Sequence, residues 1–106
     1  MKIQDMMKQA KVVQQRMEDL QAKLMTTEVE SESGGGLVKI TMTCRGDVRK
    51  LSIDPKIIKA DDKEVLEDLV AAAVNSAREL GDAKMSEETQ KLMKELGLPA
   101  DGKLPF

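Results

Sequence analysis

The chain has 106 residues, a length that suits one domain. Its 17 basic and 19 acidic side chains give a formal charge of −2, so it lacks the strong positive charge typical of nucleic-acid-binding domains. It contains no histidine and one cysteine, which argues against a zinc site and excludes a disulfide within one chain. Phe106 is the only aromatic residue, so the core must be aliphatic and modest, and oligomerisation would add buried area.

A heptad pattern over residues 3–25 predicts the first helix. Apolar residues follow one another at steps of three and four: Ile3, Met6, Ala10, Val13, Met17, Leu20 and Leu24. Such a narrow stripe favours packing against a partner helix, and only one later segment of the chain could supply that helix. Packing of the stripe on the chain's own sheet is the alternative. The pattern therefore indicates packing between helices and does not by itself indicate a chemical function.

The segment from residue 27 to residue 36 predicts an edge strand followed by a hairpin turn. Acidic residues occupy one face of this strand, at Glu28, Glu30 and Glu32, which indicates that this face is solvated. The run Gly34–Gly36 accepts positive φ at little cost and can close a hairpin. A phosphate-binding loop is the alternative, but the glycines join two strands and no Lys-Ser/Thr follows them.

Residues 37–44 and 48–53 predict two further strands of an antiparallel sheet. The second strand alternates between an apolar face, formed by Val38, Ile40, Met42 and Cys44, and a polar face, formed by Lys39, Thr41 and Thr43. The third strand points Leu51 and Ile53 inward and ends at Asp54-Pro55, because proline cannot donate to a ladder. This alternation predicts a sheet that is covered on a single side.

A short turn around Ile57–Ile58 is predicted to precede the second long helix. Asp61 is the predicted N-cap, with Glu64 completing a capping-box pattern. The helix carries an apolar stripe that includes Leu66, Leu69, Val70, Ala73, Ala77 and Leu80. This stripe is wider than that of the first helix, so we expect the second helix to be more deeply buried.

The remaining residues predict a second helical stretch and a tail. Gly81-Asp82 is a weak break, Ser86 is a predicted cap for residues 87–96, and Gly97 is the predicted end of that stretch. Residues 99–106 read as an irregular tail. We therefore expect one α+β domain over residues 1–98, with the order α-β-β-β-α around a three-stranded antiparallel sheet.

Catalytic chemistry is not expected from this sequence. Adjacent acids such as Glu87 and Glu88 point about 100° apart on a helix, so they do not converge on one substrate atom. Cys44 has no histidine to activate it and is expected to be a small buried hydrophobe. No segment approaches 18 apolar residues and no signal-peptide pattern is present, so we expect a cytoplasmic protein with no membrane partner, no cofactor and no metal.

Basic residues concentrate in the first 25 positions, which carry five basic and three acidic side chains and form the only net-basic region. Two interpretations remain open for them: a solvated helix face, or a row of phosphate contacts along a protruding helix. The candidate DNA-binding residues are those of the first helix and a sparser row on the last one: Lys2, Lys8, Lys11, Arg16, Lys23, Arg78 and Lys84.

Several segments together resemble the YbaB/EbfC nucleoid-associated proteins. The hairpin Ser33–Ile40, the strand end Ile53-Asp54-Pro55 and the run Leu66–Asn75 are similar to motifs of that family. The opening Met6–Ala10 and the ending Pro105-Phe106 are similar as well. Each segment alone is weak, but they occur in the right order over nearly the whole chain.

This resemblance implies a tweezer-like homodimer that binds double-stranded DNA through protruding helices, and a functional link to recombination-repair proteins. We expect its two-fold interface to use the apolar stripe of the second long helix: Leu66, Leu69, Val70, Ala73, Ala77 and Leu80. The sequence does not decide which apolar stripe forms the dimer and which packs within the chain. The alternative function is a protein–protein adaptor or chaperone-like module that uses exposed coiled-coil helices.

Overall fold

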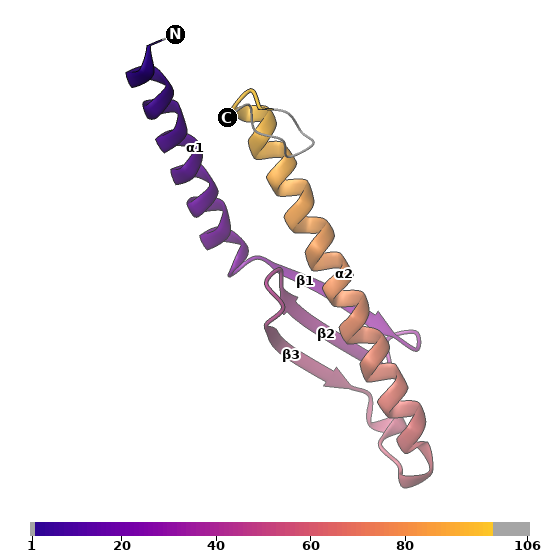
Figure 1. Ribbon diagram of the computed structural model, residues 1–106. Helices are drawn as coiled ribbons and strands as arrows, with labels where there is room; N and C mark the ends of the chain where they lie inside the picture. The colour runs from indigo at the N-terminus through magenta and orange to yellow at the C-terminus, as the bar shows by residue number, and fades with distance from the viewer. Residues whose placement is uncertain (1, 99–106) are drawn as a thin grey trace.

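The computed structural model describes residues 2–98 and has the predicted element order, α-β-β-β-α (Figure 1). The predicted tail, residues 99–106, and the motif Pro105-Phe106 lie outside the described residues. The helices and strands are α1 (Ile3–Leu24), β1 (Glu28–Ser33), β2 (Val38–Thr43), β3 (Val48–Ile53) and α2 (Lys63–Glu95), with short 3-10 helices at Pro55–Ile57 and Ala60–Asp62.

The three strands form one antiparallel sheet in the order β1-β2-β3. Ile40 of β2 lies between Ser31 of β1 and Leu51 of β3, which places these residues on the same face. The glycines of the first hairpin all have positive φ, between 62° and 98°, as the predicted turn requires. The acidic residues of β1 are exposed, which confirms the predicted alternation.

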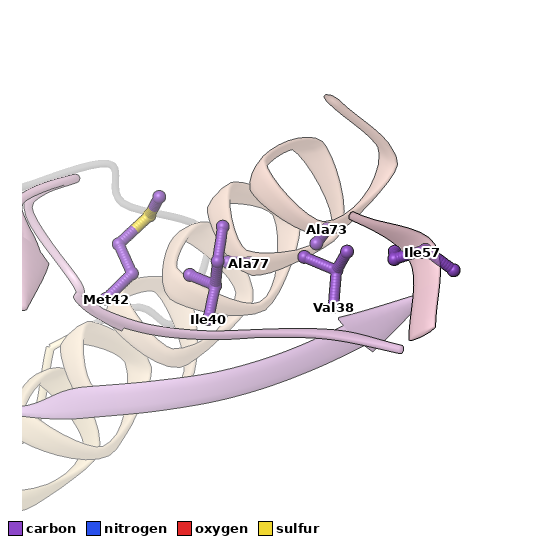
Figure 2. Packing of buried hydrophobic residues seen from close by; sticks show 6 residues of the cluster. All are labelled: Val38, Ile40, Met42, Ile57, Ala73 and Ala77. Atoms are coloured by element: carbon purple, nitrogen blue, oxygen red, sulfur yellow. The ribbon is translucent and has the colours of Figure 1, made fainter. Parts of the chain in front are cut away.

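The main core lies between β2 and the first half of α2. Val38, Ile40 and Met42 point from the sheet toward Ala73 and Ala77 of the helix (Figure 2). The two alanines are fully buried, and their small side chains let the helix lie close to the sheet. Beside them, the core is extended by partly buried residues that include Leu66, Leu69 and Val70. The sheet is therefore covered on one side, as the alternation predicted.

Coverage of that side is incomplete, because α2 packs on β1 and β2 and hardly touches β3. Leu51 was predicted to point inward, and it does lie on the face that α2 covers. Its side chain is nevertheless 48% exposed, and Val48 on the same strand is 50% exposed. The helix-side face of β3 therefore exposes an apolar surface at Val48 and Leu51, whereas Ile53 at the end of the strand packs against the core.

A second, smaller core joins α1 to the far half of α2. Leu20 and Leu24 of α1 pack with Leu92 of α2 and with Cys44, which directly follows β2. The heptad stripe of α1 therefore finds its partner helix within the same chain, and the two helices lie side by side in Figure 1. Further along the stripe Val13 is also buried, whereas Ile3 at its tip is 76% exposed.

Two predictions about the start and middle of α2 are wrong. The helix begins at Lys63 with Asp62 as its N-cap residue, so Asp61 lies one residue before the cap, within the preceding 3-10 helix. It then runs without interruption past Gly81 and Ser86, so Ser86 caps no separate helix. Gly81 is buried against the backbone of Cys44, and this tertiary contact offsets the cost of about 1 kcal/mol for a helical glycine.

The predicted end of the last helix is confirmed at Gly97. This residue has a φ of 71°, and its N–H donates to the carbonyl oxygen of Lys94 over 3.1 Å. The N–H of Leu98 donates to the carbonyl oxygen of Met93 over 2.8 Å. Together these bonds form a Schellman motif, which satisfies helix carbonyls that would otherwise lack partners.

Thr43 corrects the predicted polar face of β2. It was expected to face solvent, but it is fully buried. Its hydroxyl oxygen accepts a hydrogen bond from the backbone N–H of Asp47 over 3.1 Å, and its backbone N–H donates to the carbonyl oxygen of Asp47 over 2.8 Å. The tight β2–β3 turn thus folds against Thr43 and removes it from water, which strand periodicity alone does not anticipate.

The described chain is elongated. Its Cα radius of gyration is 19.6 Å, compared with about 13 Å for a compact domain of this length, and its extents are 70 × 21 × 16 Å. The sheet occupies one end, while α1 and the far half of α2 project from it (Figure 1). The helix pair therefore forms an arm, defined as α1 together with the part of α2 beyond Gly81.

Candidate nucleic-acid interface

Three predicted DNA-binding residues lie on the projecting part of α1 or at its N-cap. Lys2, Lys8 and Lys11 are exposed, and none takes part in an ion pair among residues 2–98. Lys11 lies nine residues from the buried Leu20, about two and a half helical turns, so it faces away from α2. These ammonium groups are available to an anion.

Three other predicted DNA-binding residues are already paired with carboxylates. An oxygen of Glu95 lies 2.6 Å from Nη2 of Arg16, which joins α1 to the end of α2. Glu88 lies 3.8 Å from Nζ of Lys23 and 3.4 Å from Nζ of Lys84. A phosphate would have to compete with these carboxylates. Arg16 and Lys23 join α1 to α2, whereas Lys84 pairs within α2.

Glu88 is the centre of this ion-pair network. Its side chain is only 15% exposed, and Lys91 joins Lys23 and Lys84 around it. A hydrogen bond from Lys84 and the charges of Lys23 and Lys91 hold the pKa of Glu88 below its ordinary value, although its partial burial acts in the opposite direction. The pKa of Lys91 is raised, chiefly by its hydrogen bond to Glu87.

Arg78 lies apart from the arm lysines, next to the turn between β2 and β3. Its Nη1 atom is 3.7 Å from the position that a Cβ would take on Gly46. The same hairpin carries exposed Arg45, Arg49 and Lys50, which are not among the predicted DNA-binding residues. Three cations within six residues are a clear sequence signal, but the three acids of β1 conceal it when charge is summed over residues 26–54.

The predicted dimer stripe is distributed between the core and the surface. Ala73 and Ala77 are fully buried against the chain's own sheet, whereas Leu80 is 46% exposed. The other three members, Leu66, Leu69 and Val70, are partly buried beside the same core. The stripe's centre is therefore occupied within one chain.

A hollow of about 700 Å³ lies mainly over the outer face of the sheet. Glu30 and Glu32 line it on β1, while Lys39 and Lys50 line it on the other two strands. Neither sign of charge dominates, so this surface does not select an anion. Among residues 2–98, no group of three or more His, Cys, Asp or Glu side chains could hold a metal ion.

Cys44 is buried, and burial raises the pKa of its thiol despite the nearby charge of Lys84. This environment suits a packing residue rather than a nucleophile. None of the helices in the described part of the chain is long and apolar enough to cross a membrane.

The fold is a small α+β domain in which a helical arm projects from a three-stranded sheet. Lysines on this arm make it a candidate nucleic-acid-binding surface. Comparison with protein families gives this class of protein a name. The chain belongs to the YbaB/EbfC DNA-binding family, which it matches over residues 1–96. Members of this family are nucleoid-associated DNA-binding proteins, which confirms the resemblance found in the sequence.

The fold is also similar to a solved structure, the crystal structure of the uncharacterized protein HP0035 from Helicobacter pylori. The two share 20% sequence identity with a TM-score of 0.75, and the match covers 88% of this chain and 98% of that one. At this identity the likeness concerns the fold.

Proposed function

We propose that this protein binds double-stranded DNA as a homodimer, mainly through phosphate contacts from the projecting arms. Membership of a DNA-binding family supports DNA as the partner. The observation that supports this placement is a set of lysines on α1 and at its N-cap that form no ion pair among residues 2–98: Lys2, Lys8 and Lys11. Arg78 is the fourth candidate without an ion pair among residues 2–98, while Arg16, Lys23 and Lys84 are secondary candidates because carboxylates already neutralise them.

Binding of this kind is electrostatic and depends on local charge. The net charge of −2 opposes DNA at long range, so the arm must present its cations close to the phosphates. Each neutralised phosphate releases counterions, and the logarithm of the binding constant then falls with the logarithm of salt concentration with a slope of about −0.9 per contact. Phosphate contacts carry no base information, so affinity should vary little with DNA sequence.

The homodimer proposal is supported by the uncovered apolar face of β3. Val48 and Leu51 are each about half exposed there, although they share a face with the buried core of β2. A second copy that packs on this face would bury them and set two arms side by side. The predicted stripe of α2 would contribute through Val70 at its margin, while Ala73 and Ala77 would support the interface from beneath.

The cellular role that fits this proposal is in the nucleoid, within the cytoplasm. A sequence-tolerant dimer with two arms suits nucleoid organisation, gene regulation, or support of recombination and repair. Recombination-repair proteins are the protein partners that the family resemblance suggests.

Charge reversal on α1 tests the proposal. In gel-shift titrations on a duplex at several salt concentrations, Lys8→Glu combined with Lys11→Glu should weaken binding on the order of tenfold or more at about 0.1 M salt. The salt slope should become shallower by about 0.9 for each phosphate that the variant no longer neutralises. The control is Lys56→Glu with Lys59→Glu, the same charge change at exposed residues near the start of α2. Equal affinities for the two double variants would remove α1 from the interface.

An adaptor function is the second candidate, and the exposed apolar tip of α1 favours it. Ile3, Met6 and Met7 are each about half exposed or more, and flexible methionines suit surfaces that accept varied protein partners. Failure of the protein to bind any duplex at low salt, together with recovery of protein partners that depend on these three residues, would favour this function over DNA binding.

A further inference from the structure

The densest positive charge in the described chain lies in the β2–β3 hairpin rather than on the arm. Residues 45–50 contain three cations, Arg45, Arg49 and Lys50, and a single acid, Asp47. All three cations are exposed. Arg49 lies at the irregularity where the register between β2 and β3 shifts, which sets it apart from the regular alternation of the strand.

Arg78 adds a fourth cation from α2. Its guanidinium lies over Gly46, and it lines the same small cavity as Arg45, of about 110 Å³. Gly81 makes this arrangement possible, because its missing Cβ lets the helix approach the backbone of Cys44 at the start of the turn. Arg45 and Arg78 are thus brought together by two packed elements. The hairpin cluster, defined as Arg45, Arg49, Lys50 and Arg78, adds two further cations from the same hairpin.

The turn that carries the cluster is held by short hydrogen bonds. The N–H of Gly46 donates to the carbonyl oxygen of Thr43 over 2.9 Å, and both the backbone and the hydroxyl of Thr43 bond to Asp47. Gly46 has a φ of 98°, a conformation that favours glycine. A rigid turn presents its arginines with a smaller decrease in conformational freedom on binding.

No member of the hairpin cluster forms an ion pair within residues 2–98. The contrast is with the arm, where Glu87, Glu88 and Glu95 neutralise most of the cations between the helices. Asp82 lines the same cavity and Asp47 lies in the turn, while Lys50 lines the outer face of the sheet together with Glu30 and Glu32. The positive excess of the cluster therefore rests on its three arginines, which have two acids near them.

We propose that the hairpin cluster is a second phosphate contact for double-stranded DNA, at the base of the arm; this inference rests on the proposed function. Arginine binds phosphate oxygens through paired N–H donors, which suits the two arginines that line one cavity. A cavity of about 110 Å³ is well below the roughly 300–1,000 Å³ of small-molecule sites, which favours an extended polyanion over an enclosed ligand.

The position of the cluster fits a duplex that runs along the arm. The N–H of Cys44 donates to the carbonyl oxygen of Thr27 over 2.9 Å, so the hairpin sits just past the end of α1 at Leu24. Lys11 lies 13 residues before Leu24, about 20 Å along the helix axis. That separation corresponds to about six base pairs at 3.4 Å each. Contacts at both places would fix the direction of the duplex relative to the arm.

The test compares charge reversals in the full chain on a fluorescent duplex over a range of salt. Arg45→Glu with Arg49→Glu should weaken binding about tenfold or more and make the salt slope shallower by about 0.9 per phosphate left without a cation. The matched control, Lys56→Glu with Lys59→Glu, carries the same change in charge and should bind like the wild type. Arg78→Gln should also weaken binding. If circular dichroism shows that the double variant does not fold, the affinity of Arg78→Gln tests the hairpin cluster in its place.

The outcomes separate this inference from the proposed function. Binding by the hairpin variants equal to that of the control would overturn the inference and leave DNA binding by the arm intact. If the wild-type protein binds no duplex at low salt, the proposed function fails and the inference fails with it. Saturable binding of inorganic phosphate at the turn, with duplex affinity unchanged in the variants, would overturn the inference in favour of a free-phosphate site.

Discussion

Gly81 connects the two cores of the molecule through the absence of a side chain. A Cβ at this position would lie 3.3 Å from the Cα of Cys44 and 3.5 Å from its carbonyl oxygen. Cys44 in turn packs with leucines of both helices, so this backbone approach links the sheet to the arm. A residue that lowers intrinsic helix propensity thus allows a close backbone contact that an added Cβ would crowd.

Gly81→Leu should therefore destabilise the protein by about 1–3 kcal/mol, because the larger side chain meets backbone atoms that cannot move aside easily. Thermal and denaturant unfolding would measure the change. Ala83→Leu is the control, since Ala83 is exposed two residues further along the same helix. Equal stability of the two variants would show that the contact at Gly81 is not restrictive.

At the scale of the elements, the predictions that held depend on local pattern. The alternation of β1, the glycine hairpin and the end of α2 at Gly97 follow from residues adjacent in sequence. The predicted break at Gly81 was wrong because a contact with Cys44, 37 residues earlier in the sequence, compensates for the glycine. Helix propensity contains no information about such a contact.

Long-range contacts also limited the prediction of the candidate DNA-binding residues. The sequence predicted which cations lie on the helices, but not which of them are neutralised. Arg16 pairs with Glu95 across 79 residues, and Lys23 pairs with Glu88 between the same two helices. The packing of α1 on α2 determines which cations are paired between the helices and which lysines, near the tip of α1, are not paired within residues 2–98.

Glu88 makes the contact between α1 and α2 dependent on pH. Because its pKa is lower in the folded protein than in the unfolded chain, its ionised form stabilises the fold at pH values above the ordinary glutamate range. This contribution disappears as the pH falls through the folded-state pKa, which lies below the ordinary glutamate value. Glu88→Gln should therefore melt at a lower temperature than the wild type at pH 7, and the difference should shrink toward pH 3.

Melting curves between pH 7 and pH 3 would measure this difference. Glu79→Gln is a suitable control, because Glu79 is an exposed residue of α2 that forms no ion pair in the described chain. A gap between Glu88→Gln and the wild type that stays constant over the whole range would contradict a role for its ionisation.

At the scale of the whole molecule, one chain leaves its sheet partly uncovered. The single long helix α2 serves both the sheet and the arm, and it covers β1 and β2 but not β3 (Figure 1). The resulting apolar surface at Val48 and Leu51 is costly in water for a protein whose aliphatic core is already small. In the proposed homodimer, a second copy of the chain would cover this surface.

Leu51→Lys should therefore shift the protein from dimer to monomer at micromolar concentration, because it places a charge at the centre of the proposed interface. Sedimentation velocity would measure the change, and DNA affinity should fall with it, since a monomer offers a single arm. Ser52→Lys is the matched control, because the neighbouring residue on β3 points to the opposite face of the sheet. A wild-type protein that sediments as a monomer, or a Leu51→Lys variant that remains a dimer, would exclude this face as the interface.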